Sequence, residues 1–159
     1  MPDQNDALRD QLVRLLDWRE AHATFDDAVD GMPDALRGQK PPRLPYSPWQ
    51  LLEHIRLTQQ DIVDFCLADE YEEREWPRDY WPDGPTPPTP TAWDESVAAV
   101  RADRERLIGM IRNPSIDLFA TVPRGTGQTY LREVLLVGDH TSYHVGELVM
   151  SRRLLGAWK

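Results

Sequence analysis

The stretch that decides the fold is Asp139-His140-Thr141-Ser142-Tyr143-His144. Two histidines four positions apart on a helix lie on one face, with Cβ atoms roughly 5–6 Å apart. At about 100° per residue, the same face carries Tyr130, Glu133, Val137, Leu148, Ser151 and Leu155. Because this stripe is mostly apolar, we predict a helix from about Thr129 to Leu155, closed by Gly156. It should direct both histidines toward the core or its rim.

A second helix has a clear start signal in Ser47-Pro48-Trp49-Gln50. Serine can cap the helix, proline fits its first position, and the glutamine can complete a capping box. This helix should run to about Leu67. One face carries His54 together with Leu51, Ile55, Thr58, Ile62 and Phe65. A third histidine is therefore predicted on a buried helical face.

Two more segments have helical periodicity. The first runs from about Ala7 to Val29 and stops at Gly31-Met32-Pro33. The other begins after Thr91, which can cap it, and ends at Asn113-Pro114. Four helices with long connections predict an all-α fold, a four-helix bundle, in a single domain that covers residues 1–159.

Composition narrows the class of protein. The chain has 159 residues, which suits one domain, and a formal net charge of −9. That charge argues against nucleic acid as a partner, because phosphate binding needs a basic patch. No stretch approaches the roughly 18–20 apolar residues that span a bilayer, the polar N-terminus does not look like a secretory signal, and the lone Cys66 cannot form an intramolecular disulfide. We expect a soluble cytoplasmic protein without a membrane partner.

Three inward-facing histidines predict a metal site. Burying imidazole rings on apolar faces is costly unless each ring finds a partner. A divalent ion held by His54, His140 and His144 would provide one, and would keep coordination positions open for water or substrate, as catalytic sites do. Zinc and nickel both suit imidazole ligands. The alternative interpretation is that these are core histidines satisfied by backbone or carboxylate hydrogen bonds.

The chain resembles the DinB-like superfamily of metal-binding four-helix bundles. The resemblance rests on Ser47-Pro48-Trp49-Gln50-Leu51-Leu52-Glu53-His54 and on Asp139-His140-Thr141-Ser142-Tyr143-His144-Val145-Gly146-Glu147-Leu148. The order and spacing of the four helices also agree, so it covers nearly the whole chain. In that family, one histidine of the second helix and two of the fourth bind a divalent metal, often zinc or nickel. The resemblance implies these roles for His54, His140 and His144, and it implies a homodimer.

Three further residues are weaker candidates for the site. His22 could approach the same cavity from the first helix, although a core or rim role is the simpler interpretation. Glu133 shares the histidine face and could be a general base or a hydrogen-bond acceptor for a ligand, while an ion pair with Arg132 is the simpler interpretation. Glu147 lies one turn after His144 and could orient its imidazole, as bound histidines usually require.

The segment 69–90 is the least helical part of the chain. It is acidic at first, then rich in aromatic residues and proline. Connections of this length inside a domain are often functional or disordered. Four aromatic side chains could line a substrate pocket or fill gaps beneath the segment: Trp49, Trp76, Tyr80 and Trp81. Tyr143 is expected to pack between helices, and Cys66 to be a small buried apolar residue.

Two functions remain open at this point. A metal with open positions activates water or a thiol, and the resemblance implies a metal-dependent enzyme, either a thiol S-transferase or a hydrolase. Its partner would be a low-molecular-weight thiol or another small molecule. The alternative is a non-catalytic metal-binding module, or a stress-related protein that binds a small ligand. Fold-level likeness does not decide between them.

Overall fold

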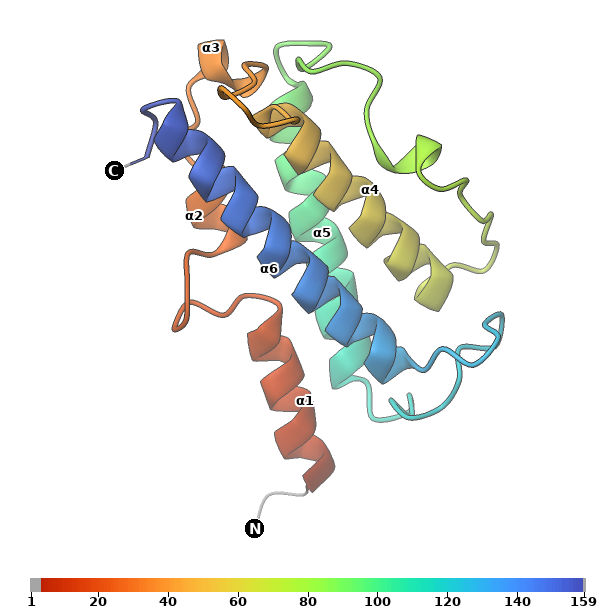
Figure 1. Cartoon of the computed structure of the whole chain (residues 1–159). Helices are drawn as coiled ribbons and strands as arrows, with labels where there is room; N and C mark the ends of the chain where they lie inside the picture. The colour runs from red at the N-terminus through yellow and green to blue at the C-terminus, as the bar shows by residue number, and fades with distance from the viewer. Residues whose placement is uncertain (1–3, 159) are drawn as a thin grey trace.

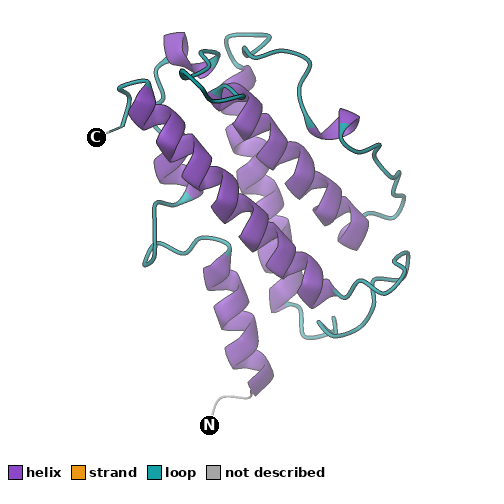
Figure 2. Ribbon diagram, in the orientation of Figure 1, coloured by secondary structure: helices purple, strands orange, loops and turns teal. Residues whose placement is uncertain are grey.

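The protein is all-α, as the periodicity predicts. In a computed structural model, residues 4–158 of the chain are described (Figure 1). Figure 2 shows that this part of the chain is built from helices and connecting loops, and its one β feature is an isolated bridge between Thr121 and Thr129. The elements are α1 (Gln4–Leu15), α2 (Phe25–Val29), α3 (Asp34–Arg37), α4 (Pro48–Leu67), the 3₁₀ helix η1 (Arg78–Tyr80), α5 (Ala92–Arg112) and α6 (Tyr130–Leu154).

The two helices that carry the histidines begin where local sequence signals predict. At the start of α4, the Gln50 N–H donates to Ser47 Oγ and the Ser47 N–H donates to Gln50 Oε1, both at 3.2 Å. At the start of α6, Thr129 Oγ1 accepts from the Arg132 N–H at 3.2 Å. Each cap satisfies amide groups that the first helical turn leaves without an intrahelical partner. The side chains on these helices are therefore held in a defined register.

The prediction of one helix from Ala7 to Val29 is wrong. Helix α1 ends at Leu15 and α2 begins at Phe25. A capping box starts the second helix, in which the Thr24 side chain accepts from the Asp27 N–H and the Asp27 carboxylate accepts from the Thr24 N–H. This local signal outweighs the apolar spacing across residues 16–23, and it ends the helical run.

Helix α5 begins and ends where predicted, but Thr91 does not cap it as predicted. Thr91 precedes α5 with φ −92° and ψ −16°, and its side chain makes no capping hydrogen bond. Its hydroxyl instead pairs with the Thr89 hydroxyl at 3.3 Å. A residue with helical backbone angles does not aim its side chain back at the first turn, since capping residues usually have extended angles.

The parallel course of α4 and α5 explains the length of the segment that connects them. Figure 1 shows α4 and α5 running in the same direction, whereas α6 runs antiparallel to both. The chain must therefore travel back along α4 before α5 can begin, and it does so through residues 68–91. On this return path η1 contacts α4. The aromatic part of the segment is thereby placed against the helix that carries His54.

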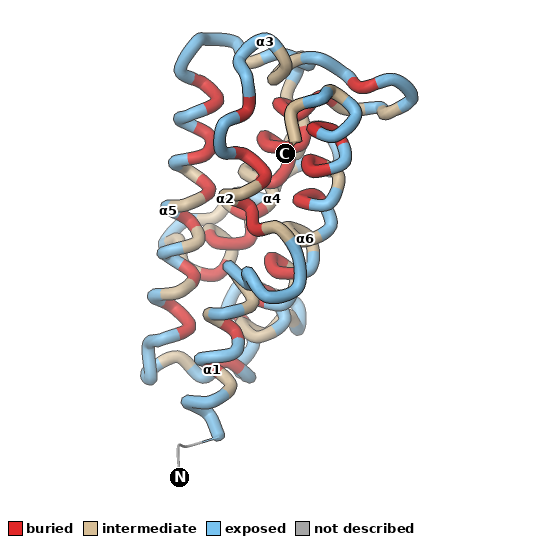
Figure 3. Tube along the Cα trace, turned by 90° about the vertical axis from the view of Figure 1, so that its left-hand side faces the viewer, coloured by how far each residue is buried: buried red, intermediate tan, exposed pale blue. Residues whose placement is uncertain are grey.

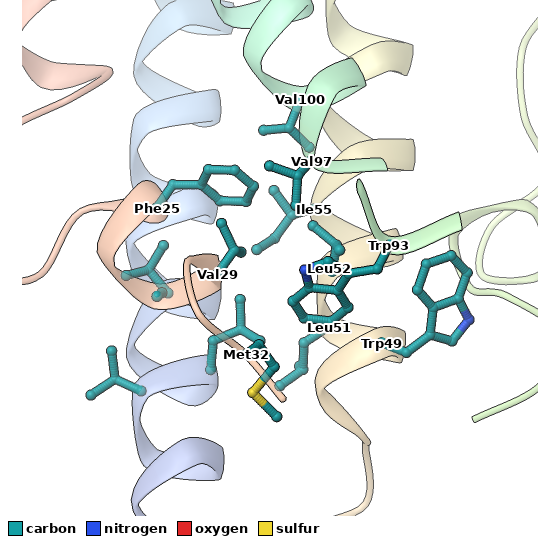
Figure 4. Close-up of a cluster of buried hydrophobic side chains, with 14 of the residues drawn as sticks. Phe25, Val29, Met32, Trp49, Leu51, Leu52, Ile55, Trp93, Val97 and Val100 are labelled. Atoms are coloured by element: carbon teal, nitrogen blue, oxygen red, sulfur yellow. The ribbon is translucent and has the colours of Figure 1, made fainter. Parts of the chain in front are cut away.

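The core fills the space between the long helices in two clusters. Figure 3 shows buried positions along their inward faces. One cluster joins α2, α4, α5 and α6, and Figure 4 shows Phe25 and Trp49 at its two sides with Leu52 and Trp93 between them. The other joins α1, α4, α5 and α6 near Leu107. These clusters fix α4 against α6, the pair of helices that carries the three histidines.

Candidate metal centre

The structure brings the three histidines together across the antiparallel pair α4 and α6. The ring centroid of His54 lies 4.9 Å from that of His140 and 4.6 Å from that of His144, and the latter two are 4.5 Å apart. One nitrogen from each ring lies within 4.8 Å of the other two. His54 and His144 are buried, and His140 is half-buried. The sequence therefore predicted correctly that the histidine-bearing faces of both helices point inward.

Two of the rings are oriented by hydrogen bonds at their far nitrogen. His54 Nδ1 pairs with the backbone carbonyl of Tyr80 at 2.7 Å. His144 Nδ1 pairs with Glu147 Oε2, also at 2.7 Å. A carbonyl and a carboxylate accept hydrogen bonds, so we assign the proton of each ring to Nδ1. Nε2 of each ring then carries no proton and is able to bind a metal, and metal-bound histidines usually have this arrangement.

The spacing of the free nitrogens suits a single ion. Nε2 of His54 lies 3.1 Å from Nε2 of His140. Two nitrogens that are each about 2.1 Å from a tetrahedral zinc ion lie roughly 3.4 Å apart. The charge state also fits, because burial and the two neighbouring imidazoles lower the pKa of His140 to about 4. Burial, followed by the His54 ring, lowers the pKa of His144 to about 4, and burial also lowers the pKa of His54. Neutral imidazoles are the form that binds metals.

The segment between α4 and α5 closes one side of the site with stacked aromatic rings. Trp81 stacks on His54 with centroids 3.9 Å apart and an interplanar angle of 4°. Tyr46 covers the other face of Trp81 at 4.1 Å. Stacking of this kind fixes the plane of the His54 ring. Tyr46 was not a sequence candidate, since nothing in the proline-rich stretch before α4 indicates its partner.

Asp61 anchors the same segment to α4. Its carboxylate accepts from the Tyr80 hydroxyl at 2.7 Å and from the Tyr71 hydroxyl at 3.1 Å. Both tyrosines lie in the segment 69–90, and Tyr80 also provides the carbonyl that meets His54. Asp61 therefore holds in place the backbone group that orients one of the three rings.

Of the four aromatic residues predicted to line a pocket or fill gaps, Trp49 belongs to the core. It is 4% exposed and packs in the cluster shown in Figure 4. Trp76, Tyr80 and Trp81 all lie beside His54, with the Trp76 ring 6.4 Å from it. Trp49 lies on the first turn of α4 and packs into the core, whereas the other three residues lie in the segment between α4 and α5 that passes His54.

His22 and Glu133 do not join the histidine cluster. His22 is exposed, and its ring pairs with the carbonyl of Ala23 beside the cavity of about 30 Å³ near α1. His22 lies in the connection between α1 and α2 rather than on the single helix that was predicted. Glu133 is buried and forms the expected ion pair with Arg132, at 2.7 Å.

Of the two remaining predictions about single side chains, the one for Cys66 is confirmed and the one for Tyr143 is wrong. Burial raises the pKa of the Cys66 thiol to about 12, which agrees with the expected small buried residue. The expectation for Tyr143 is wrong, because its side chain is 67% exposed rather than packed between helices. Its ring meets the edge of His144 at 4.9 Å. On α6 this position lies just outside the buried stripe, so the ring reaches solvent beside the site.

Replacing Glu147 with alanine should lower the affinity for zinc about 10–100-fold, because His144 loses the group that orients it. Glu147→Gln keeps an oxygen acceptor and should recover most of that loss. Asp139→Ala is the matched control, since it removes an exposed carboxylate from the same helix. Competition with a chromophoric chelator gives the affinities. Equal losses for Asp139→Ala and Glu147→Ala would mean that charge matters and the hydrogen bond does not.

The metal-free protein should lose stability as the pH falls from about 6.5 toward 4. In this range the unfolded chain takes up protons on histidines whose ordinary pKa is 6.5, whereas folded His140 and His144 stay neutral until about pH 4. Burial raises the pKa of Glu147, which acts in the opposite direction, but three histidines with lowered pKa outweigh it. Urea unfolding across this range, with His140→Ala for comparison, measures the effect. An equally steep loss in His140→Ala would contradict this origin.

The fold and the site define a class: an all-helical protein with three histidines gathered between two antiparallel helices. The family model of the DinB superfamily matches residues 17–148, which include all three. The chain therefore belongs to the DinB superfamily. Comparison with curated proteins found no match, and comparison with solved structures found none. Among the described residues, no helix is both long enough and apolar enough to cross a membrane.

Proposed function

We propose that the chain is a single DinB-like four-helix bundle in which His54, His140 and His144 hold one divalent metal ion, zinc or nickel. We further propose that the protein is a metal-dependent enzyme, either a thiol S-transferase or a hydrolase. Membership of the DinB superfamily and the three-histidine cluster are compatible with metal binding. We propose the reaction class from the chemistry that a divalent metal with an open coordination position supports.

One observation carries the proposal. The Nδ1 atoms of His54 and His144 are each held by an oxygen acceptor, and Nε2 of His54 lies 3.1 Å from Nε2 of His140. Within residues 4–158, the group of possible metal ligands contains these three side chains alone. A three-histidine set leaves at least one coordination position open, which is typical of catalytic rather than structural sites.

A divalent ion in this site would supply Lewis-acid chemistry and lower the pKa of a coordinated water or thiol. The protein's own groups prepare the site for such an ion in three ways. The Tyr80 carbonyl and the Glu147 carboxylate hold two rings in the binding orientation. Trp81 and Tyr46 cover one side of His54 and exclude water there. The three lowered histidine pKa values keep the ligands free of competing protons near neutral pH.

The second candidate function is a non-catalytic module that binds metal or a small ligand. One feature favours it: the carboxylate nearest the cluster, Glu147, is already engaged with His144. Glu147 is thus not free to act as a general base. A transferase whose substrate thiol loses its proton on coordination would not need one.

The deciding experiment is a screen of the metal-loaded protein against several cellular thiols with an electrophile, together with a panel of ester and amide substrates. His54→Ala serves as the site-deficient control. Turnover that requires added zinc or nickel and disappears in His54→Ala supports the enzyme. Stoichiometric metal without turnover across both panels favours the binding module. Equimolar metal in both His54→Ala and His140→Ala contradicts the three-histidine site itself.

A further inference from the structure

Two aromatic side chains stand exposed beside the metal centre. Trp76 is 68% exposed and Tyr143 is 67% exposed. They come from different parts of the chain, Trp76 from the segment between α4 and α5 and Tyr143 from α6. The Trp76 ring is tilted 54° to His54 at 6.4 Å, and the Tyr143 ring meets the edge of His144 at 4.9 Å. Two large rings thus border the histidine cluster while most of their surface faces solvent.

The exposed position of Trp76 is maintained by its neighbours. Its ring packs against Tyr80 at 5.3 Å, and Tyr80 is anchored through its hydroxyl to Asp61. The indole is therefore held at the site although it buries little of its own surface. Exposed indole and phenol rings are strong binding surfaces for apolar and aromatic groups, because each buries a large area with few rotatable bonds.

The charges around these rings select against an anionic substrate. Arg78 lies close to Trp76 in sequence, but it pairs with Glu75 and Asp79. Arg74 contacts Asp61 and Gln60. On the α6 side, Glu147 lies beside His144.

The chain as a whole carries a formal charge of −9. A negatively charged group that approached the site would therefore meet carboxylates and guanidinium groups that are already paired. A bound divalent ion would attract an anion at the metal itself, whereas the net negative charge of the chain lowers the affinity for negatively charged groups at a distance from the metal.

We propose that the substrate of this metal centre carries an aromatic ring and no net negative charge, with the ring packing against Trp76 and Tyr143. This inference rests on the proposed metal site. The metal-binding end of the substrate would meet the three histidines, while its ring would cover apolar surface that is now exposed to water. Trp76 and Tyr143 would then set specificity without touching the metal.

Cobalt-loaded protein gives a direct test, because a thiolate that binds Co²⁺ produces a charge-transfer absorption band. Three probe thiols separate the contributions: benzyl mercaptan is neutral and aromatic, 2-mercaptoethanol is neutral without a ring, and 4-(mercaptomethyl)benzoate is aromatic and anionic. Benzyl mercaptan should bind about tenfold more tightly than 2-mercaptoethanol. The benzoate should bind several-fold more weakly than benzyl mercaptan.

Two variants link this preference to the proposed rings. Trp76→Ala and Tyr143→Ala should each weaken benzyl mercaptan binding about five- to tenfold and leave 2-mercaptoethanol unaffected. Phe119→Ala is the matched control, since this ring is 63% exposed and lies in the connection between α5 and α6. It should change neither affinity.

The outcomes separate this inference from the metal site beneath it. Cobalt uptake with equal affinities for all three thiols, or equal effects of Trp76→Ala and Phe119→Ala, would overturn the substrate class and leave the metal site standing. A wild-type protein that takes up no cobalt, nickel or zinc would contradict the metal site and the inference together.

Discussion

Replacing His140 with alanine should lower the affinity for zinc by more than about a hundredfold. Loss of a group that merely orients a ligand already costs 10–100-fold, and His140 is itself one of only three possible ligands in the cluster. Its Nε2 lies 3.1 Å from that of His54, and its removal leaves only two of the three ligand nitrogens. Competition with a chromophoric chelator measures the change, and any metal-dependent turnover should vanish with it.

His22→Ala is the control for this prediction. The protein has four histidines, and His22 is the exposed one that lies outside the cluster. Its removal should leave zinc affinity within about twofold of wild type. Comparable losses in the two variants would show that metal binding does not depend on the cluster. Circular dichroism of each variant shows whether the helices are retained.

Replacing Leu148 with alanine should lower the free energy of unfolding by about 2–5 kcal/mol. Leu148 lies on α6, one turn after His144, and is completely buried in the cluster that joins α2, α4, α5 and α6. Truncation removes apolar contacts and leaves a cavity, because neighbouring side chains close such a space only in part. Denaturation of metal-free protein by urea measures the loss, and a small decrease in metal affinity should accompany it because α6 carries two of the ligands.

Leu135→Ala is the matched control for the core. It makes the same substitution within the same helix, but Leu135 is 47% exposed. Its effect should stay within about 0.5 kcal/mol, since alanine is also the best helix former. Equal losses for Leu148→Ala and Leu135→Ala would show that burial in the core does not determine how much each side chain stabilises the fold.

The parts of the fold that could be predicted from sequence are those with local causes. Helix α4 begins at a capping box with proline at its first position, and α6 begins at Tyr130, where Thr129 caps it. With each register set by its cap, helical periodicity was enough to place His54 and the two histidines of α6 on inward faces. The pairing of α4 with α6 followed from the apolar stripes and from the family resemblance.

The first helix shows how periodicity can mislead. Apolar residues recur at helical spacing across the break between Leu15 and Phe25, so the pattern predicts continuity. The contrary signal was present in Thr24 and Asp27, which form a capping box three residues apart. Recognition of that box would also have removed His22 from the list of candidates.

The support behind the histidines could not be predicted because its causes are non-local. His54 is held by the carbonyl of Tyr80 and the ring of Trp81, which follow it by more than 25 positions. Their placement depends on the parallel course of α4 and α5, which returns the chain past the site. Backbone carbonyls leave no mark in the sequence, and Tyr46 meets Trp81 only because both lie beside the same end of α4. Glu147 could be predicted, since it lies three residues from His144 on one helix.

The central claim is that His54, His140 and His144 bind one metal ion through Nε2. Long-range ¹H–¹⁵N correlation spectra test it directly, because each of the four imidazoles gives its own pair of nitrogen signals. One equivalent of zinc should shift the Nε2 signals of the three site histidines, leave Nδ1 of His54 and His144 protonated, and leave His22 unchanged. A response at fewer than three of these histidines, or an equal response at His22, would contradict the account.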